Sequence, residues 1–171
     1  KILPQKILSL IGSVLVFAFS CIIFYLNQEW GSIVLFAGNW RPPYGITFVT
    51  DTLSTVMLLL TSIVGLAISI YSNAAVSHSR IKFGYFPIFH FLLMGLSGTF
   101  LTGDIFNMYV WFEIVIISSF VLLTLGGKRM QMEGAVKYMA MNMLASIIFL
   151  TAIGILYGIT GSLNIADIGM K

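Results

Sequence analysis

A chain of 171 residues in which 58% of the residues are hydrophobic and 9% are charged is unlike a soluble domain, where charged residues make up about 25%. Its formal net charge of +3 does not indicate nucleic-acid binding, because the nine basic residues are dispersed in pairs between hydrophobic stretches. The composition therefore excludes an ordinary soluble domain and predicts a protein whose solvent is the lipid bilayer.

Five apolar segments are long enough to cross the hydrocarbon core of a bilayer as helices. A single span in lipid must be helical, because it has to satisfy its backbone hydrogen bonds internally, and the alternating pattern of a porin-like barrel does not occur in the sequence. We therefore predict an all-α, polytopic integral membrane protein that forms one transmembrane helical unit over residues 1–171. Its helices are expected near residues 7–26, 53–71, 85–101, 105–125 and 136–157, with an external loop over residues 27–52.

The external loop over residues 27–52 contains a Pro-Pro pair followed by a glycine, which is a turn signal. Two short extended pieces around this turn would form a hairpin, and a structured loop without strands fits the sequence equally well. Asp51 stands just before the second span and Asp104 just before the fourth. Both positions are typical of helix N-caps, and a role at the mouth of an ion pathway is the alternative.

The last three spans carry signals of close helix packing. Only residues 102–104 connect the third span to the fourth, so these two helices should be antiparallel neighbours. Gly95 and Gly98 lie on the third span, and Gly154 and Gly158 form a GxxxG motif on the fifth. Small residues at helical spacing let membrane helices approach closely, so we expect the third and fifth spans to be buried between neighbours.

The basic residues fall mainly on alternate connections between the spans, and the positive-inside rule places the side that is richer in them in the cytoplasm. The residues of that side are Lys1, Lys6, Arg80, Lys82, Lys128 and Arg129, whereas the opposite side carries Arg41 and Lys171. The N-terminal end should therefore be cytoplasmic and the C-terminal end external.

The sequence offers little for classical enzyme chemistry. Its single cysteine, Cys21, lies within the first span, so neither an internal disulfide nor a cysteine-based metal site is expected. We find no phosphate-binding loop, nucleophile–base pair or haem-type histidine pair, and we therefore expect no cofactor, no metal and no enzymatic activity. The chain begins with lysine and both ends arrive abruptly, and we interpret it as a fragment.

Glu113 is the most informative residue, because it is a lone carboxylate near the middle of an apolar span. Burying an unpaired carboxylate in hydrocarbon costs at least about 2.5–3.5 kcal/mol on insertion scales. Its helical face is almost wholly apolar, and desolvation raises the pKa of a carboxylate toward neutrality unless a cation offsets it. The position predicts a group that takes up and releases protons, and a hydrogen bond that merely joins two helices is the alternative.

Lys137 is the candidate partner of Glu113, because the fourth and fifth spans are joined by a short loop and should be adjacent. Glu113 lies roughly 18 Å from the cytoplasmic end of its helix, whereas Lys137 lies only about one turn into the next span. A water-linked pair is therefore more plausible than a direct salt bridge. The alternative is that Lys137 extends to the membrane interface as a positive-inside residue.

Three further polar residues lie within the expected spans. His90 titrates near neutrality when solvated, and it either relays protons or binds a backbone carbonyl of a neighbouring helix. Asn142 and Ser146 are one helical turn apart, and we interpret them as hydrogen-bonding groups between helices rather than as the lining of a wet seam.

Several motifs resemble the antiporter-like membrane subunits of complex I, and most closely the D-type subunits of the Mrp-type multisubunit Na⁺/H⁺ antiporters. The stretch LTGDIFNMYVWFE, which ends at Glu113, resembles the fifth-helix region of that family. The motif GAVKY, which contains Lys137, and the later motif LYGITGSLN are similar to the sixth helix and the loop after it. Upstream, the motifs RPPYGI and DTLS also fit the D-type subunits, so the resemblance covers nearly the whole chain.

The resemblance implies that Glu113 matches the functional glutamate of the family and that Lys137 matches its basic sixth-helix residue, both acting in proton transfer. It implies a protein of about fourteen helices with two inverted repeats, in which the five spans here are helices two to six. The seventh helix with its central lysine, the first helix and the second repeat are absent from this chain.

The same resemblance implies a multi-pass subunit of a hetero-oligomeric antiporter complex in a bacterial inner membrane, exchanging Na⁺ or a similar monovalent cation for H⁺. One alternative is the proton-pumping subunit of a respiratory NADH dehydrogenase or membrane hydrogenase complex. A further alternative is a structural membrane subunit that is needed only for assembly.

Overall fold

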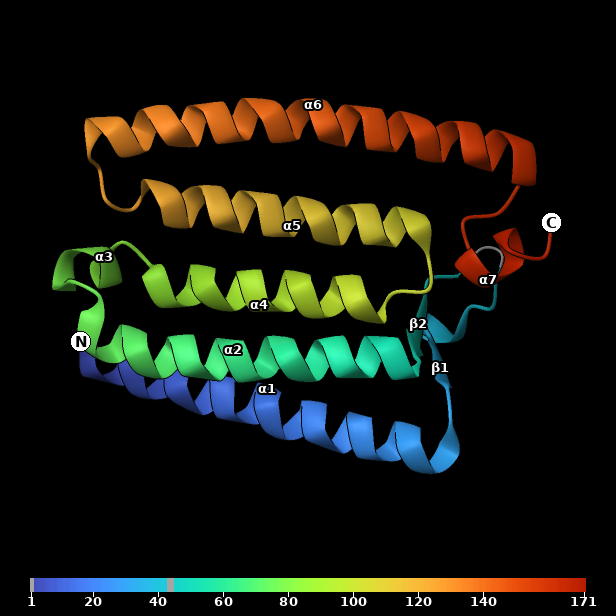
Figure 1. Ribbon diagram of the computed structural model, residues 1–171, viewed down its shortest axis with the longest axis horizontal. Coiled ribbons are helices and arrows are strands. Elements are labelled where there is room, and N and C mark those ends of the chain that lie inside the picture. The colour runs from blue at the N-terminus through green and yellow to red at the C-terminus, as the bar shows by residue number, and fades with distance from the viewer. Residues whose placement is uncertain (1, 43–44) are drawn as a thin grey trace.

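Five long helices lie side by side, and the chain runs back and forth through them (Figure 1). The computed structural model describes residues 2–42 and 45–171. The long helices are α1 (Ile2–Trp30), α2 (Thr52–Ala75), α4 (Tyr85–Leu101), α5 (Ile105–Thr124) and α6 (Arg129–Thr160). The short elements are the strands β1 (Ile33–Phe36) and β2 (Thr47–Thr50), the 3-10 turn η1 (Ala37–Asn39) and the helices α3 (His78–Lys82) and α7 (Ile165–Ile168).

This architecture confirms the predicted all-α, polytopic fold. Helices α1, α2, α5 and α6 are long and apolar enough to cross a membrane, and α4 is a shorter apolar helix of 17 residues. Helices α1 and α6 have 29 and 32 residues and extend beyond the expected spans at both ends. At 1.5 Å per residue each is more than about 40 Å long, which exceeds the roughly 30 Å hydrocarbon core.

The loop between α1 and α2 folds into a hairpin, which decides between the two structures that the sequence left open. Strands β1 and β2 pair antiparallel, from Ile33 opposite Thr50 to Phe36 opposite Thr47. The Asn27 side chain fastens this hairpin to the end of α1, since its Nδ2 donates to the carbonyl oxygens of Gly31 and Thr50. Lys1 and the turn residues 43–44 lie outside the described residues.

Both predicted N-caps are present. The carboxylate of Asp51 accepts a hydrogen bond from the backbone N–H of Ser54 at 2.6 Å and begins α2. The carboxylate of Asp104 accepts one from the backbone N–H of Asn107 at 2.7 Å and begins α5. Each side chain thereby satisfies one of the free N–H groups at a helix start.

A ladder of small polar residues joins α1 to α2, and the sequence analysis did not foresee it. Ser13, Ser20 and Asn27 on α1 are spaced seven residues apart, as are their counterparts on α2, and all are buried. Ser20 Oγ lies 2.6 Å from Ser62 Oγ at the centre of the interface. The α2 residues of this polar ladder are Thr55, Ser62 and Ser69. Small hydroxyl residues let membrane helices pack closely, and here the buried Ser69 Oγ has no hydrogen-bond partner among the described residues.

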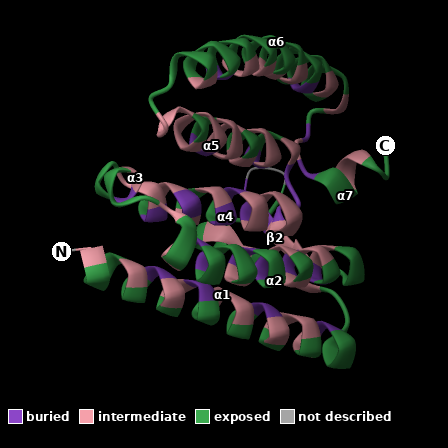
Figure 2. Cartoon of the chain, turned by 60° about the vertical axis from the view of Figure 1, so that its left-hand side comes forward, coloured by how far each residue is buried: buried purple, intermediate pink, exposed green. Residues whose placement is uncertain are grey.

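The two expected small-residue contacts have opposite outcomes. A Cβ atom on Gly98 would lie 2.2 Å from the Trp111 ring of α5, so α4 is packed tightly against α5, as predicted. On α6, a Cβ atom on Gly154 or Gly158 would meet no atom within 4 Å among the described residues. The prediction that this last span is buried between neighbours is therefore wrong for the described part of the chain. One face of α6 rests on α5 and the rest is exposed (Figure 2).

Candidate ion-translocation site on helix α5

The middle of α5 is held by aromatic contacts on two sides. Toward α4, the Trp111 ring packs over Gly98. Toward α6, the rings of Tyr109 and Phe112 each lie 6.1 Å from the ring of Phe149, measured between centroids. These contacts fix the rotation of α5 about its axis and therefore the direction of every other side chain on it.

Glu113 lies on the part of α5 that faces neither α4 nor the centre of the α6 contact. Its neighbours one turn away, Val110 and Ile117, are 39% and 52% exposed, and Glu113 itself is half-buried. Tyr109, one turn earlier, lies on the same side of the helix as Glu113. The face is apolar, as predicted, but the described residues enclose the carboxylate only in part.

Lys137 does not reach Glu113. Its Nζ atom lies 2.8 Å from Oε1 of Glu133, one turn earlier on α6, and its side chain is 74% exposed. Phe149 on α6 lies level with the turn of α5 that precedes Glu113, because its ring contacts the rings of that turn. Counting from this level at 1.5 Å per residue, Lys137 lies about 14 Å further along the bundle axis than Glu113. The expected difference in depth between the two residues is therefore present, and they form no direct salt bridge.

The polar residues of α6 that lie nearer to Glu113 are Ser146 and Asn142. Ser146 lies at about the same depth as Glu113 by the register that Phe149 sets. Asn142 lies one turn further toward Lys137, and its Nδ2 donates to the carbonyl oxygen of Tyr138 within α6 at 2.8 Å. The bond that the structure shows for Asn142 is thus within its own helix rather than between helices.

His90 is a second titratable group, and it belongs to another interface. Its Nε2 lies 3.0 Å from Ser9 Oγ and 3.2 Å from the Ser9 carbonyl oxygen, so it joins α4 to α1. The close packing of Gly98 against Trp111 separates this interface from the face that carries Glu113. The bond to a backbone carbonyl matches the structural alternative that the sequence analysis gave for His90.

At the other end of the bundle, hydrogen bonds join three connections. We call this hydrogen-bonded cluster of loops the loop knot. The backbone N–H of Gly103 donates to the carbonyl oxygen of Thr47 at 2.8 Å, and the N–H of Ile165 donates to the Gly103 carbonyl oxygen at 2.9 Å. Asn164 Nδ2 donates to Thr47 Oγ1 at 3.0 Å. The loop knot thus joins the hairpin, the α4–α5 link and the α6–α7 link.

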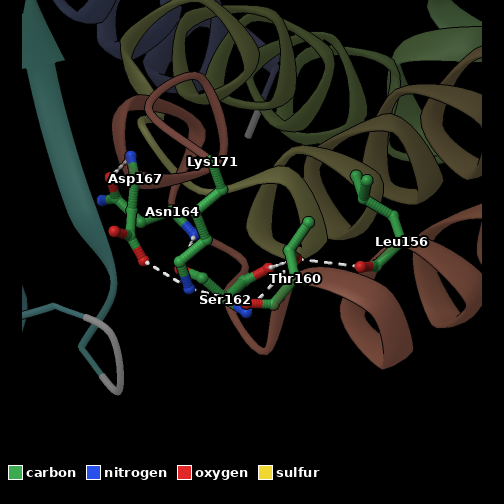
Figure 3. Close-up of polar contacts among 6 residues, drawn as sticks. All are labelled: Leu156, Thr160, Ser162, Asn164, Asp167 and Lys171. Atoms are coloured by element: carbon green, nitrogen blue, oxygen red, sulfur yellow. Dashed lines mark hydrogen bonds and ion pairs between the residues drawn. The ribbon is translucent and has the colours of Figure 1, made fainter.

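The α6–α7 link has its own internal bonds (Figure 3). Thr160 Oγ1 accepts from the backbone N–H of Ser162, and the backbone N–H of Asp167 donates to Asn164 Oδ1. Lys171 Nζ donates to the Thr160 carbonyl oxygen and lies 3.6 Å from the Asp167 carboxylate. The loop knot was missed because its bonds join loops far apart in sequence, and only the cluster of Thr, Ser and Asn at loop positions hinted at it.

The electrostatics at the knot end agree with capping. Hydrogen bonds from the side chain and backbone of Ser54 hold the pKa of Asp51 below its usual range. Within residues 2–42 and 45–171, no group of three or more His, Cys, Asp or Glu side chains is arranged to hold a metal ion. Asp104 is buried and caps α5, so its observed role is the structural one.

Four helices long and apolar enough to cross a bilayer, one of them with an ionisable group midway along it, define a multi-pass membrane protein. A family model described as NADH:quinone oxidoreductase/Mrp antiporter, transmembrane, matches residues 102–171. The chain is therefore similar to this family of membrane subunits. This confirms the resemblance inferred from its motifs.

Proteins named as D subunits of cation/proton antiporters are similar to the chain over most of its length. The D subunit of the Na(+)/H(+) antiporter of Alkalihalophilus pseudofirmus is 39% identical over 170 residues, which cover 98% of this chain and 34% of that protein. The Bacillus subtilis protein of the same name is 42% identical over 82% of this chain and 29% of its own length. The D subunit of a probable K(+)/H(+) antiporter of Rhizobium meliloti is 41% identical over 82% of this chain and 26% of its own length.

Two solved structures share the fold. A chain of the membrane-bound sulfane sulfur reductase, an archaeal respiratory membrane complex, matches with a TM-score of 0.92 and 30% identity, over 96% of this chain and 34% of that chain. A chain of the Mrp complex from Dietzia sp. matches with a TM-score of 0.90 and 26% identity, over 98% of this chain and 32% of that chain. The chain thus spans about a third of the length of these relatives.

Proposed function

We propose that this chain is part of a membrane subunit that exchanges protons for a monovalent cation, with Na⁺ as the first candidate, and that Glu113 is its protonatable group. The observation that carries the proposal is the position of Glu113. Among the described helices it is the only carboxylate at mid-depth of a membrane-spanning segment. Such residues mark proton and ion routes in membrane proteins.

The chemistry follows from the surroundings of the carboxylate. In its protonated form Glu113 is neutral and is tolerated on the apolar face formed with Val110 and Ile117. In its ionised form it needs a compensating positive charge, which a cation arriving by another route or a neighbouring basic group supplies. Loss of the proton and arrival of the cation are thereby coupled through one group, which is the basis of exchange.

Lys137 is the proposed partner in proton transfer. Because Lys137 and Glu113 lie at different depths, protons must pass between them through water or intervening polar groups. Ser146, at the depth of Glu113, and Asn142, one turn nearer to Lys137, are the α6 residues suited to carry such a path. The ion pair with Glu133 places the Lys137 ammonium on the exposed side of α6.

The test is ΔpH-driven antiport in inverted membrane vesicles that contain the full-length parent complex. Glu113→Gln should abolish transport, whereas Glu113→Asp, which keeps a titratable carboxylate, should retain part of it. Native gels on the same membranes must show that both variants assemble. Wild-type transport by an assembled Glu113→Gln complex would refute the proposal and would favour a subunit needed only for assembly.

The proton-pumping subunit of a redox-driven complex is the second candidate function. The fold match to a chain of an archaeal respiratory membrane complex supports it, since that match has the higher TM-score and identity of the two structures. The names of the sequence relatives, which are antiporter subunits, support the first candidate. Purification of the parent complex decides between them, because a redox-driven complex must contain electron-carrying subunits and a pure antiporter contains none.

We further infer that the chain acts as a transporter component and not as a classical enzyme, and that it binds other subunits of a hetero-oligomeric complex in the bacterial cell membrane. The end of the bundle with Lys6 and α3 is proposed to face the cytoplasm and the hairpin to face outward. Cysteine labelling tests this orientation in a Cys21→Ser background. A membrane-impermeant thiol reagent added to intact cells should label Ser32→Cys but not Ser79→Cys, and the reverse pattern would invert the topology.

A further inference from the structure

Helices α1 and α4 leave a long hollow between them. At the end of the bundle that carries Lys6 and α3, which we call the basic end, this hollow has a volume of about 430 Å³. Its walls run from Gln5 to Leu15 on α1 and from Phe86 to His90 on α4, and they are almost entirely apolar. No described element covers it.

The hollow is one leaflet deep. From Gln5 to Leu15 the α1 wall extends about 15 Å, which is half of the roughly 30 Å hydrocarbon core. Its inner end is narrowed where the His90 ring lies against Gly12, since a Cβ atom there would be 3.2 Å from the ring. A second hollow begins beyond this contact, at Val16. A transmembrane helix would need one uninterrupted groove, whereas a lipid chain needs only the depth of its own leaflet.

The short helix α3, which adjoins the helices on both sides of the hollow, is basic. Helix α3 packs against both α1 and α4, the two helices that form the walls, and Ile81 anchors it with a side chain that is 1% exposed. The same short helix carries Arg80 and Lys82, and both are in its last turn. The described carboxylate at the basic end is Glu133, which is paired with Lys137. A negatively charged headgroup therefore finds attraction and little repulsion there.

The geometry points to a binding site for an anionic phospholipid. One acyl chain fills the hollow between α1 and α4, and the phosphate-bearing headgroup lies at Arg80 and Lys82 on α3. The site is separate from Glu113, because the packed contact between α4 and α5 lies between them. Lipid binding at this site requires no transport activity, so the proposal can be tested independently of the proposed antiport.

The test uses the full-length parent complex in vesicles of phosphatidylcholine with a minor fraction of phosphatidylglycerol. Either lipid is supplied with a diazirine in one acyl chain, and the adducts are mapped by mass spectrometry after illumination. We expect the ratio of phosphatidylglycerol to phosphatidylcholine adducts on residues 5–15 and 86–90 to exceed the bulk ratio about tenfold. Residues 144–155 of α6, which lie on an exposed apolar helix, serve as the reference and should show the bulk ratio.

Two pairs of charge substitutions then test the headgroup. The double variant Arg80→Gln/Lys82→Gln should return the adduct ratio in the hollow to the bulk value, with phosphatidylcholine labelling unchanged. The matched control, Lys128→Gln/Arg129→Gln, removes two charges from the other basic connection at the same end and should leave the ratio high. Native gels confirm assembly of both variants.

The proposal is overturned by any of three results. Equal adduct ratios in the hollow and on α6 would mean that the site does not select an anionic lipid. Hollow residues that take up neither probe, while α6 is labelled, would mean that a polypeptide segment fills the space. An equal loss of enrichment in both double variants would mean that the general charge of this end, and not α3, attracts the lipid.

Discussion

The α1–α2 pair and helix α6 are built in opposite ways. Between α1 and α2, buried hydroxyl and amide side chains recur at every second turn, and the Ser20–Ser62 bond lies at the centre of the interface. Helix α6 is longer than either, yet among the described elements it packs mainly along α5. A Cβ atom on either glycine of its GxxxG motif would meet no described atom within 4 Å. Figure 2 shows the difference as an almost continuous exposed surface over α6.

The contrast is between a helix pair that is held together by hydrogen bonds within the chain and a helix that is largely exposed among the described residues. The α1–α2 pair is closed by its own hydrogen bonds and by the hairpin that Asn27 fastens to it. Among the described residues, helix α6 and the side of α5 that carries Glu113 are largely exposed. The candidate site therefore lies on the less enclosed side of the described bundle, in a chain that spans about a third of the length of its relatives.

The largest effect on stability is expected from replacing a tightly packed glycine, Gly98, in comparison with an exposed one, Gly154. Gly98→Ala places a Cβ atom 2.2 Å from the Trp111 ring, so it should destabilise the protein by about 1–3 kcal/mol. Gly154→Ala meets no described atom and should be neutral or stabilising by up to about 1 kcal/mol. Thermal unfolding of the full-length protein in detergent measures both. Equal destabilisation would show that α6 packs against a further helix in the full-length protein.

The next effect concerns the start of α2 and depends on pH. Asp51→Ala removes the N-cap and should cost about 1 kcal/mol at pH 7. Because hydrogen bonds from Ser54 lower the folded-state pKa of Asp51, its contribution is complete above its unfolded pKa of about 3.9 and disappears as the pH falls through the lower folded value. Unfolding midpoints of wild type and variant should therefore converge in strong acid. Asp51→Asn keeps a cap without a charge, and its advantage over Asp51→Ala should not vary with pH.

A smaller effect tests whether the polar ladder contributes to the strength of the α1–α2 interface. A double-mutant cycle of Ser20→Ala and Ser62→Ala should give a coupling energy of about 0.6 kcal/mol, the average for hydrogen bonds between membrane helices. Thr151→Ala on α6 is the control, since Thr151 Oγ1 donates to a carbonyl of its own helix. A coupling energy of zero would mean that the interface depends on close packing alone.

The smallest stability effect is expected at the exposed end of α6. Lys137→Gln breaks the pair with Glu133, and because both side chains are mostly exposed, unfolding should change by less than about 0.5 kcal/mol. Glu133→Gln is the matched variant and should behave alike in unfolding. In antiport assays the two should differ, with transport lost only in Lys137→Gln. Equal transport in both variants would assign Lys137 a surface role.

The spans and caps were predictable because they depend on local sequence. A run of about twenty apolar residues has one stable structure in lipid, and an aspartate before such a run has an evident use at the helix start. The depth difference between Glu113 and Lys137 also followed from residue counting, because the rise per residue of a helix is fixed. These inferences needed no knowledge of which helix lies beside which.

The polar ladder, the loop knot and the exposure of α6 were not predictable because each depends on a partner. Serines spaced by seven residues lie in the sequence of α1, but their use requires the matching residues of α2 at the right height. The GxxxG motif at Gly154 indicates that close approach is possible and does not identify the approaching helix. The enclosure of Glu113 is of the same kind, since it depends on what covers α5.

The loop knot also bears on the order of folding. The bond from Asn164 to Thr47 joins residues 117 positions apart, and it fastens the hairpin between α1 and α2 to the segment after α6. It forms only after all five long helices have been synthesised and α6 has brought Asn164 to the hairpin end. Contacts of such long sequence separation close late because of their loop-closure entropy. The hairpin between α1 and α2 is therefore completed by a residue that follows Thr47 by 117 positions.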